Sequence, residues 1–194
     1  LRYPQLRGLP VVVGGRRAVA GEHLHDFPRL RNYAGRGVIT TSTYEARALG
    51  VHSGMGLMKA AQLAPDAVLL PADFEAYRHH SRLFKAAVCA IAPEMEDRGI
   101  DEIYLGLTTL NPDGSRDGAR AIALHLQQAV REATGLSCSL GVAPNKLLAK
   151  LCSDLEKPAG ITVVAAEDIP ARIWPLPARR INGIGPKAAA RLEA

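Results

Sequence analysis

The sequence predicts an α+β fold, in which a β-sheet carries helices on one of its faces. Three observations indicate this class. Short β-branched runs alternate with longer segments of helical periodicity, and clusters of turn residues separate them. The second half of the chain follows the order strand, strand, helix, strand, helix, strand, and this order favours an α+β sheet with its helices on one side.

The first half is predicted to contain five short elements. Residues 9–15 form a β-branched run closed by two glycines, which predicts a buried strand and a turn. Residues 37–51 begin as a strand and continue as one or two helical turns over 44–49. We expect a short amphipathic helix over 55–64, because a proline follows it, and another buried strand over 67–71.

The longest helical pattern covers residues 73–92, with Asp73 as an N-cap and a proline after its end. Its apolar stripe consists of Phe74, Tyr77, Leu83, Phe84, Ala87, Val88 and Ile91. The later elements are expected to be two strands within 94–108, a turn cluster at 111–118, a helix over 119–133, a strand over 136–144, a helix over 145–157 capped by Asn145, and a strand over 160–164. Near Ala165 the composition changes to a proline-rich stretch, which indicates a domain boundary.

Composition limits the class of protein. With 194 residues, 47% of them hydrophobic and 22% charged, the chain can build one good core or two small ones. No apolar run approaches the roughly 20 residues that span a bilayer, so we expect a cytoplasmic protein without a membrane segment. Its three cysteines lie far apart in apolar patterns and are expected to be small buried side chains. A net charge of +5 favours nucleic acid or a nucleotide phosphate as partner.

Two adjacent carboxylates, Asp101 and Glu102, precede the apolar run of the second hairpin strand. Neighbouring side chains of a strand point to opposite faces, so both can reach one ion only from a strand end or a sharply twisted hairpin. There they suit Mg²⁺, which takes one or two carboxylates and completes its shell with water and substrate phosphate. The alternative is a solvated turn that opens a strand.

Basic and hydroxyl side chains form two further candidates. Thr41, Tyr44 and Arg47 are spaced by three across a strand-to-helix turn, where an arginine can bind phosphate oxygens through two hydrogen bonds. The alternative is a threonine-capped helix start with a surface arginine. Lys146 and Lys150 share one face of a helix, and the alternative for them is an ordinary solvated amphipathic face.

The segment "INGIGPKAAARLEA" contains a Gly-Ile-Gly turn before a helix start. Such a hairpin can present backbone N–H groups to a DNA phosphate without reading sequence, and the alternative is a plain interhelical turn. The histidine pairs, His23 with His25 and His79 with His80, lack partners at zinc spacing and are expected to lie at the surface.

Taken together, five segments resemble the Y-family translesion DNA polymerases, in their bacterial DNA polymerase IV-like branch. They are "LRYPQLRGLPVVVGG", "RGVITTSTYEARALGVHSGM", "GIDEIYLGLT", "GVAPNKLLAKLCSDLEKPAGI" and "RINGIGPKAAARL". The resemblance implies a ferredoxin-like palm sheet, a small fingers domain and a partial helical thumb with a helix-hairpin-helix. Residues 1–6 would be an N-terminal remnant of the palm, 7–72 the fingers, 73–164 the palm and 165–194 the thumb.

The same resemblance implies template-directed DNA synthesis past damage, by two-Mg²⁺ phosphoryl transfer from a deoxynucleoside triphosphate onto primed DNA. A sliding clamp would bind through a C-terminal region outside this chain. The implied metal-binding and catalytic residues are Asp101 and Glu102. The implied nucleotide-binding residues are Arg36, Thr41, Tyr44, Arg47 and Lys150, and the implied DNA-binding residues are Gly183, Gly185 and Lys187.

Four departures accompany the resemblance. The chain opens after the point where the family carries a strand with a further metal-binding aspartate and a steric gate, and it ends within the thumb. Gly99 stands where the family has serine, and residues 16–34 replace a short turn. We therefore expect a piece of a longer protein that is inactive alone. The alternatives are a catalytically inactive Y-family-like accessory protein that binds DNA or partners, and another palm-type enzyme such as a nucleotide cyclase.

Overall fold

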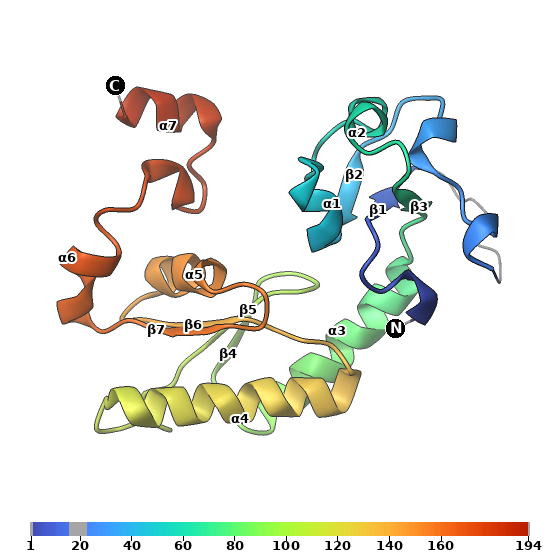
Figure 1. Ribbon diagram of the computed structural model, residues 1–194. Coiled ribbons are helices and arrows are strands. Elements are labelled where there is room, and N and C mark those ends of the chain that lie inside the picture. The colour runs from blue at the N-terminus through green and yellow to red at the C-terminus, as the bar shows by residue number, and fades with distance from the viewer. Residues whose placement is uncertain (1, 16–22, 194) are drawn as a thin grey trace. The chain divides into compact units, whose positions relative to one another are not determined.

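The computed structural model describes residues 2–15 and 23–193 of the chain (Figure 1). The chain divides into two compact units, Leu1–Phe74 and Glu75–Ala194. Both mix short strands with helices, so the predicted α+β class is confirmed. Most of the predicted insertion at 16–34 lies in residues 23–34, and the rest falls outside the described residues.

The first unit is built on a three-stranded sheet of order β2-β1-β3. Strand β1 (Val11–Gly14) pairs antiparallel with β2 (Ile39–Ser42) and parallel with β3 (Val68–Leu70). Helices α1 (Tyr44–Ala48) and α2 (Leu57–Leu63) follow β2, and three 3₁₀ turns, Pro4–Leu6, Leu24–Asp26 and Leu30–Asn32, complete the unit. All five strands and helices predicted in this half are confirmed. Its main core is apolar and closed to solvent, and includes Val12, Leu30, Ile39, Val51, Leu57 and Ala60.

Thr43 fixes the corner between β2 and α1. Its Oγ1 accepts hydrogen bonds from the N–H groups of Ala46, at the helix start, and of Val11, at 3.5 and 3.0 Å. It also donates to the carbonyl oxygen of Leu9 at 3.1 Å. One hydroxyl group thus joins a helix cap to the neighbouring strand, because a threonine oxygen can accept from a free helix N–H while its proton points elsewhere.

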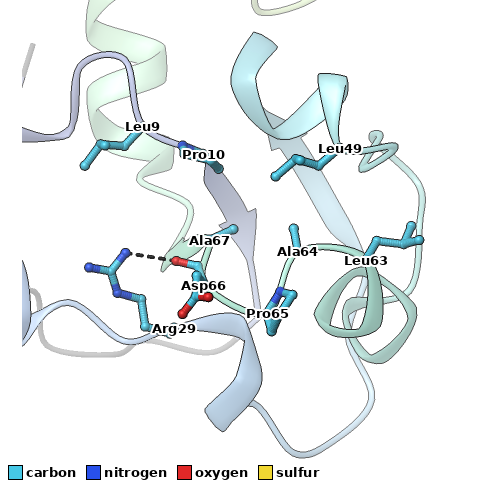
Figure 2. A pocket seen from close by; sticks show the side chains of 9 residues that line it. All are labelled: Leu9, Pro10, Arg29, Leu49, Leu63, Ala64, Pro65, Asp66 and Ala67. Carbon is cyan, nitrogen blue, oxygen red and sulfur yellow. Dashed lines mark hydrogen bonds between the residues drawn. The ribbon is translucent and has the colours of Figure 1, made fainter.

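A hollow of about 430 Å³ lies on the surface of the first unit, as Figure 2 shows. Arg29 stands at its side and donates to the carbonyl oxygen of Asp66 at 2.9 Å. None of the residues predicted to bind a nucleotide lines it. The lining residues are Leu9, Pro10, Arg29, Leu49, Leu63, Ala64, Pro65, Asp66 and Ala67.

The second unit contains two strand pairs. Strands β4 (Met95–Asp97) and β5 (Ile103–Leu105) form an antiparallel hairpin, and β6 (Leu140–Val142) pairs parallel with β7 (Ile161–Val163). The three long helices are α3 (Phe74–Cys89), α4 (Arg116–Thr134) and α5 (Lys146–Leu155). These elements match the predicted order.

The start of α4 differs from the prediction. The helix begins at Arg116 instead of residue 119, because the Oγ of Ser115 accepts a hydrogen bond from the N–H of Gly118 at 3.2 Å and caps it. Residues 116–118 therefore belong to the helix and not to the turn cluster.

Helices cover both faces of the β6–β7 pair, so the expectation that they gather on one face is wrong here (Figure 1). Leu140 packs with Leu126 and Val130 of α4. Gly141 faces the other way, and a Cβ atom built on it would lie 2.1 Å from the carbonyl oxygen of Ala149 in α5. A strand residue without a side chain therefore lets α5 pack against the sheet at close range.

The C-terminal segment is made of short pieces. It contains a 3₁₀ turn at Ala166–Asp168, α6 (Ile169–Arg172), a second 3₁₀ turn at Ala178–Arg180 and α7 (Pro186–Leu192). Arg116 of α4 binds it, with Nη2 2.6 Å from Oε1 of Glu167 and Nη1 3.0 Å from Oδ1 of Asp168. These contacts fix the first turns of the segment to the body of the unit.

The cysteines correct one prediction. Cys152 is buried and Cys138 is half-buried, but Cys89 is exposed on α3, so the prediction of three buried thiols is wrong at that position.

Within residues 2–15 and 23–193, no helix is both long enough and apolar enough to cross a membrane.

Candidate active site

The β4–β5 hairpin places Asp101 and Glu102 at the end of a tight turn, directly before β5. Gly99 enables this turn with a φ of +113°, a region that L side chains rarely adopt. Its N–H donates to Oδ1 of Asp97 at 2.9 Å, and the N–H of Arg98 donates to the carbonyl oxygen of Glu102 at 3.0 Å. The carboxylates thus lie at a strand end within a hairpin, the position that a shared ion requires.

Lys85 of α3 holds the turn from the core side. Its ammonium group donates to Oδ2 of Asp97 at 2.7 Å and to the carbonyl oxygen of Gly99 at 2.6 Å. The hydrogen bond from Lys85, followed by that from the N–H of Gly99, lowers the pKa of Asp97 below its ordinary value. The turn that carries Asp101 and Glu102 is therefore anchored to α3.

The two faces of the hairpin differ in character. Ile103 and Leu105 pack into the core with α3 and α4, so Tyr104 lies on the opposite face. Glu96 stands across from Tyr104 in the register. The ring centroid of Tyr104 lies 5.8 Å from Cζ of Arg98 and 5.9 Å from Nζ of Lys146. Charged groups thus gather on the face away from the core, around one aromatic ring.

Helix α5 supplies two lysines to this face. Asn145 caps the helix, its Oδ1 accepting from the N–H of Leu148 at 2.9 Å, as predicted. One turn apart, Lys146 pairs with Glu96 and Lys150 pairs with Glu102. The side chain of Lys146 is 63% exposed, whereas that of Lys150 is 18% exposed. The solvated-face alternative is therefore wrong for Lys150.

Lys150 carries a stabilised positive charge. Burial disfavours its charged form, but the hydrogen bond with Glu102 and the charges of Asp154 and Glu102 outweigh that penalty and raise its pKa. Nζ of Lys150 lies 3.9 Å from Oδ2 of Asp154, four residues along the helix. Lys157 lies beyond the helix, with Nζ 2.6 Å from Oδ1 of the same aspartate. Glu102, Lys150, Asp154 and Lys157 therefore form a row of alternating charges.

Asp101 differs from its neighbour. It is exposed, and across the part of the chain that the structure describes, no hydrogen bond or ion pair involves its carboxylate. No cluster of three or more His, Cys, Asp or Glu side chains suited to a metal occurs among the described residues. Two adjacent carboxylates still fit Mg²⁺, because this ion takes one or two carboxylates and fills its remaining positions with water and phosphate.

Four of the five predicted nucleotide-binding residues belong to the first unit, and three of them, Thr41, Tyr44 and Arg47, lie on β2 and α1 at either side of the corner between these elements. Tyr44 and Arg47 stand one turn apart on α1, with Cζ of Arg47 5.3 Å from the ring centroid of Tyr44. Nε of Arg47 donates to the carbonyl oxygen of Ser42 at 3.2 Å. Thr41 is exposed on β2, and Arg36 is exposed in the loop before β2. The corner thus presents an oriented guanidinium group.

The predicted DNA-binding residues lie near the chain's end. Gly183 has a φ of +90°, and the N–H of Ile184 donates to the carbonyl oxygen of Ile181 at 3.0 Å to close the turn. Gly185 caps α7, and Lys187 is exposed in its first turn. The element before this turn is the 3₁₀ turn Ala178–Arg180 and not a full helix.

Sequence reasoning missed three residues that build the site: Lys85, Glu96 and Arg98. The alternation of Glu94, Glu96 and Arg98 marks a polar strand face and was a usable signal for Glu96. No comparable signal distinguishes Lys85, since it is one of several basic residues on α3.

These features define a two-unit α+β protein with an acidic hairpin facing a lysine-bearing helix. The chain belongs to the impB/mucB/samB family, whose model matches residues 1–154. It is 40% identical to the DNA polymerase IV of Methanoculleus marisnigri over 192 residues, covering 99% of this chain and 49% of that protein. It is also 40% identical to the DNA polymerase IV of Halorhodospira halophila over 190 residues, covering 98% of this chain and 48% of that protein.

Solved structures agree with this assignment. The crystal structure of DinB from Sulfolobus solfataricus has a TM-score of 0.81 and 32% identity, and the match covers 98% of this chain and 51% of that one. An insertion ternary complex of Dbh DNA polymerase has a TM-score of 0.80 at the same identity and coverage. The predicted resemblance to Y-family DNA polymerases is therefore confirmed. The chain spans about half the length of the relatives that it matches.

Proposed function

We propose that this chain forms part of the active site of a template-directed DNA polymerase that copies damaged DNA, with primed DNA and a deoxynucleoside triphosphate as substrates. One observation carries the proposal: Asp101 and Glu102 share a hairpin end that faces the cationic helix α5. Phosphoryl transfer needs anionic metal ligands next to cations that bind phosphate, and this face contains both. The names of the relatives, DNA polymerase IV, support the same reaction.

We assign Asp101 and Glu102 as the ligands of two Mg²⁺ ions. When bound, the ions would lower the pKa of the primer 3′-hydroxyl group and neutralise charge on the leaving pyrophosphate. Asp101 offers an exposed carboxylate without a competing partner in the described part of the chain. Hydrogen bonds of Lys85 and Gly99 brace the backbone of the turn, so the two carboxylates project from a preorganised turn.

For the triphosphate we assign Thr41, Tyr44, Arg47 and Lys150, and for the nascent base pair Arg36. Arg47 suits phosphate because its Nε already donates to Ser42, while its two terminal nitrogens face no other described partner. The ring of Tyr44 beneath it limits its rotamers. Lys150 adds a lasting positive charge beside the metal ligands.

For the duplex we assign Gly183, Gly185 and Lys187, whose turn leaves backbone N–H groups and an ammonium group exposed for phosphate contacts. In this scheme residues 7–72 are the fingers, 73–164 the palm and 165–194 part of the thumb. Cytoplasmic location and recruitment by a sliding clamp complete the proposal.

We do not favour the alternatives. An inactive accessory protein has no chemical need for a partnerless aspartate beside a paired glutamate, and the family match favours a polymerase over a nucleotide cyclase.

A chimera tests the proposal. This chain would replace the matching half of the Methanoculleus marisnigri DNA polymerase IV, and primer extension would be measured with Mg²⁺. We expect extension by the chimera, and a loss of about a thousandfold or more in Asp101→Asn with duplex binding retained. Asp117→Asn, an exposed aspartate in the first turn of α4, is the matched control and should extend normally. Unchanged extension by Asp101→Asn would refute the assignment.

A further inference from the structure

Two lysine–glutamate pairs join α5 to the hairpin, and they differ in one respect. Lys146 pairs with Glu96 in the middle of β4, and Lys150 pairs with Glu102 at the hairpin end. Both lysines stand on one face of one helix, and both glutamates are about half exposed. Only Glu102 neighbours the partnerless carboxylate of Asp101. The first pair is thus a structural duplicate of the second, outside the assigned metal ligands.

Lys150 has a second carboxylate within reach. Oδ2 of Asp154 lies 3.9 Å from its Nζ, and Oδ1 of Asp154 binds Lys157. Lys146 has no second carboxylate among the described contacts. If Lys150 releases Glu102, its ammonium group therefore keeps a partner on its own helix. The cost of breaking the Glu102 pair is reduced, because the charge is not left unpaired in a half-buried place.

Adjacent carboxylates need positive charge between them or near them. Two anionic side chains on neighbouring residues repel each other, and a cation close to one of them relieves that repulsion. Lys150 supplies such a cation without any metal. A divalent ion supplies twice the charge at the same place and accepts both carboxylates as hard oxygen ligands.

We propose that Lys150 is a positioning residue that holds Glu102 in the metal-free protein and yields it to a divalent cation. On metal binding, the ammonium group exchanges Glu102 for Asp154 and becomes available to the triphosphate. The Lys146–Glu96 pair stays closed throughout and keeps α5 docked on the hairpin. This proposal rests on the proposed function, since it takes Asp101 and Glu102 as metal ligands.

Double-mutant cycles on the 194-residue chain test the exchange. The first cycle combines Lys150→Met with Glu102→Gln, and the matched control cycle combines Lys146→Met with Glu96→Gln. Urea unfolding is measured in EDTA and again in saturating Mg²⁺. In EDTA we expect each pair to show a coupling of about two- to fivefold in the unfolding constant. Saturating Mg²⁺ should abolish the coupling of Lys150 with Glu102 and leave that of Lys146 with Glu96 unchanged.

Mn²⁺ binding, followed by electron paramagnetic resonance, provides a second measurement. Removing the competing ammonium group in Lys150→Met should tighten Mn²⁺ binding about three- to tenfold. Lys146→Met removes the same charge one turn away and should change it less than about twofold. Lys150→Arg, which keeps the positive charge, should bind Mn²⁺ as the unchanged chain does.

Several outcomes would overturn the exchange: a Lys150–Glu102 coupling that Mg²⁺ leaves intact, equal Mg²⁺ effects on both cycles, or no Mn²⁺ binding by the chain. Neither measurement needs DNA or a nucleotide. An active chimera together with metal-insensitive coupling would therefore refute only the exchange, and an inactive chimera with metal-sensitive coupling would refute only the polymerase.

Discussion

Lys85 and Asp97 lie on different elements, α3 and β4, and the ammonium group of the first stands 2.7 Å from Oδ2 of the second. The same ammonium group also binds the carbonyl oxygen of Gly99. Because its side chain is 17% exposed, water competes weakly for these contacts. One lysine of the long helix thereby fixes the turn from which Asp101 and Glu102 project.

Replacing this lysine should loosen the turn. We expect Lys85→Met to lower the melting temperature by about 2–4 °C. Scanning calorimetry measures this change, and hydrogen exchange should show faster exchange of the Gly99 amide. Lys59→Met, at an exposed position of α2, is the control and should change neither. A Gly99 amide that exchanges at its original rate would contradict the role of Lys85.

The lowered pKa of Asp97 predicts acid sensitivity. A carboxyl group whose pKa is lower in the folded than in the unfolded state stabilises the fold above its unfolded pKa, near the reference value of 3.8. That contribution is lost as the pH falls below this value and through the lower folded pKa. Asp97→Asn should therefore be less stable than the unchanged chain at pH 5–7, as measured by urea unfolding. The difference in the free energy of unfolding between Asp97→Asn and the unchanged chain should narrow below about pH 4. A difference that stays constant with pH would disprove this dependence.

Removal of the hydroxyl group of Thr43 should destabilise the corner between β2 and α1. Thr43→Val keeps the shape of the side chain but removes the cap of α1 and the bond to Val11. We expect a loss of about 1–2 kcal/mol in the free energy of unfolding. Thr40→Val, at an exposed position of β2, serves as the control and should cost little. Equal losses in the two variants would contradict the capping role.

Lys150 and Lys157 both contact Asp154. Comparing variants at the two lysines therefore tests whether Lys150 is the one that binds the triphosphate. In the chimera, we expect Lys150→Ala to raise the KM for the deoxynucleotide about tenfold or more. Lys157→Ala should raise it less, because its side chain is 41% exposed and stands outside the hairpin contacts. A larger increase in KM for Lys157→Ala would contradict the assignment. It would indicate that Lys157 contacts the triphosphate and that Lys150 pairs only with carboxylates.

Much of the fold follows from local patterns. β-branched runs predicted the strands, and Asn145 with the proline after residue 157 predicted the limits of the lysine helix. The start of α4 was missed because Asp117 and Gly118 are typical turn residues, and the cap of Ser115 outweighs their preference. The packing of helices on both faces of β6–β7 depends on Gly141, which leaves room for α5. This role could not be predicted from the sequence, because it depends on the position of α5 against the strand.

The sequence predicted the residues of the candidate site better than it predicted the contacts between them. Asp101, Glu102 and Lys150 were assigned from resemblance, whereas the pair of Lys150 with Glu102 joins residues 48 positions apart. Charge patterns do not identify partners at such separations, because every exposed lysine has several acidic residues within reach. The anchor at Lys85 depends in the same way on the packing of α3 against the hairpin.

The site's two halves are short-range assemblies. The hairpin folds from one stretch of chain, and β6, α5 and β7 fold from another, so each needs little loop closure to form. Their relative alignment comes from a shared apolar floor, where Val88 of α3 and Leu126 of α4 pack with Leu140. Substitutions among these apolar residues should therefore leave both halves folded and yet bring lysines and glutamates out of line, so that the proposed site is lost before the fold.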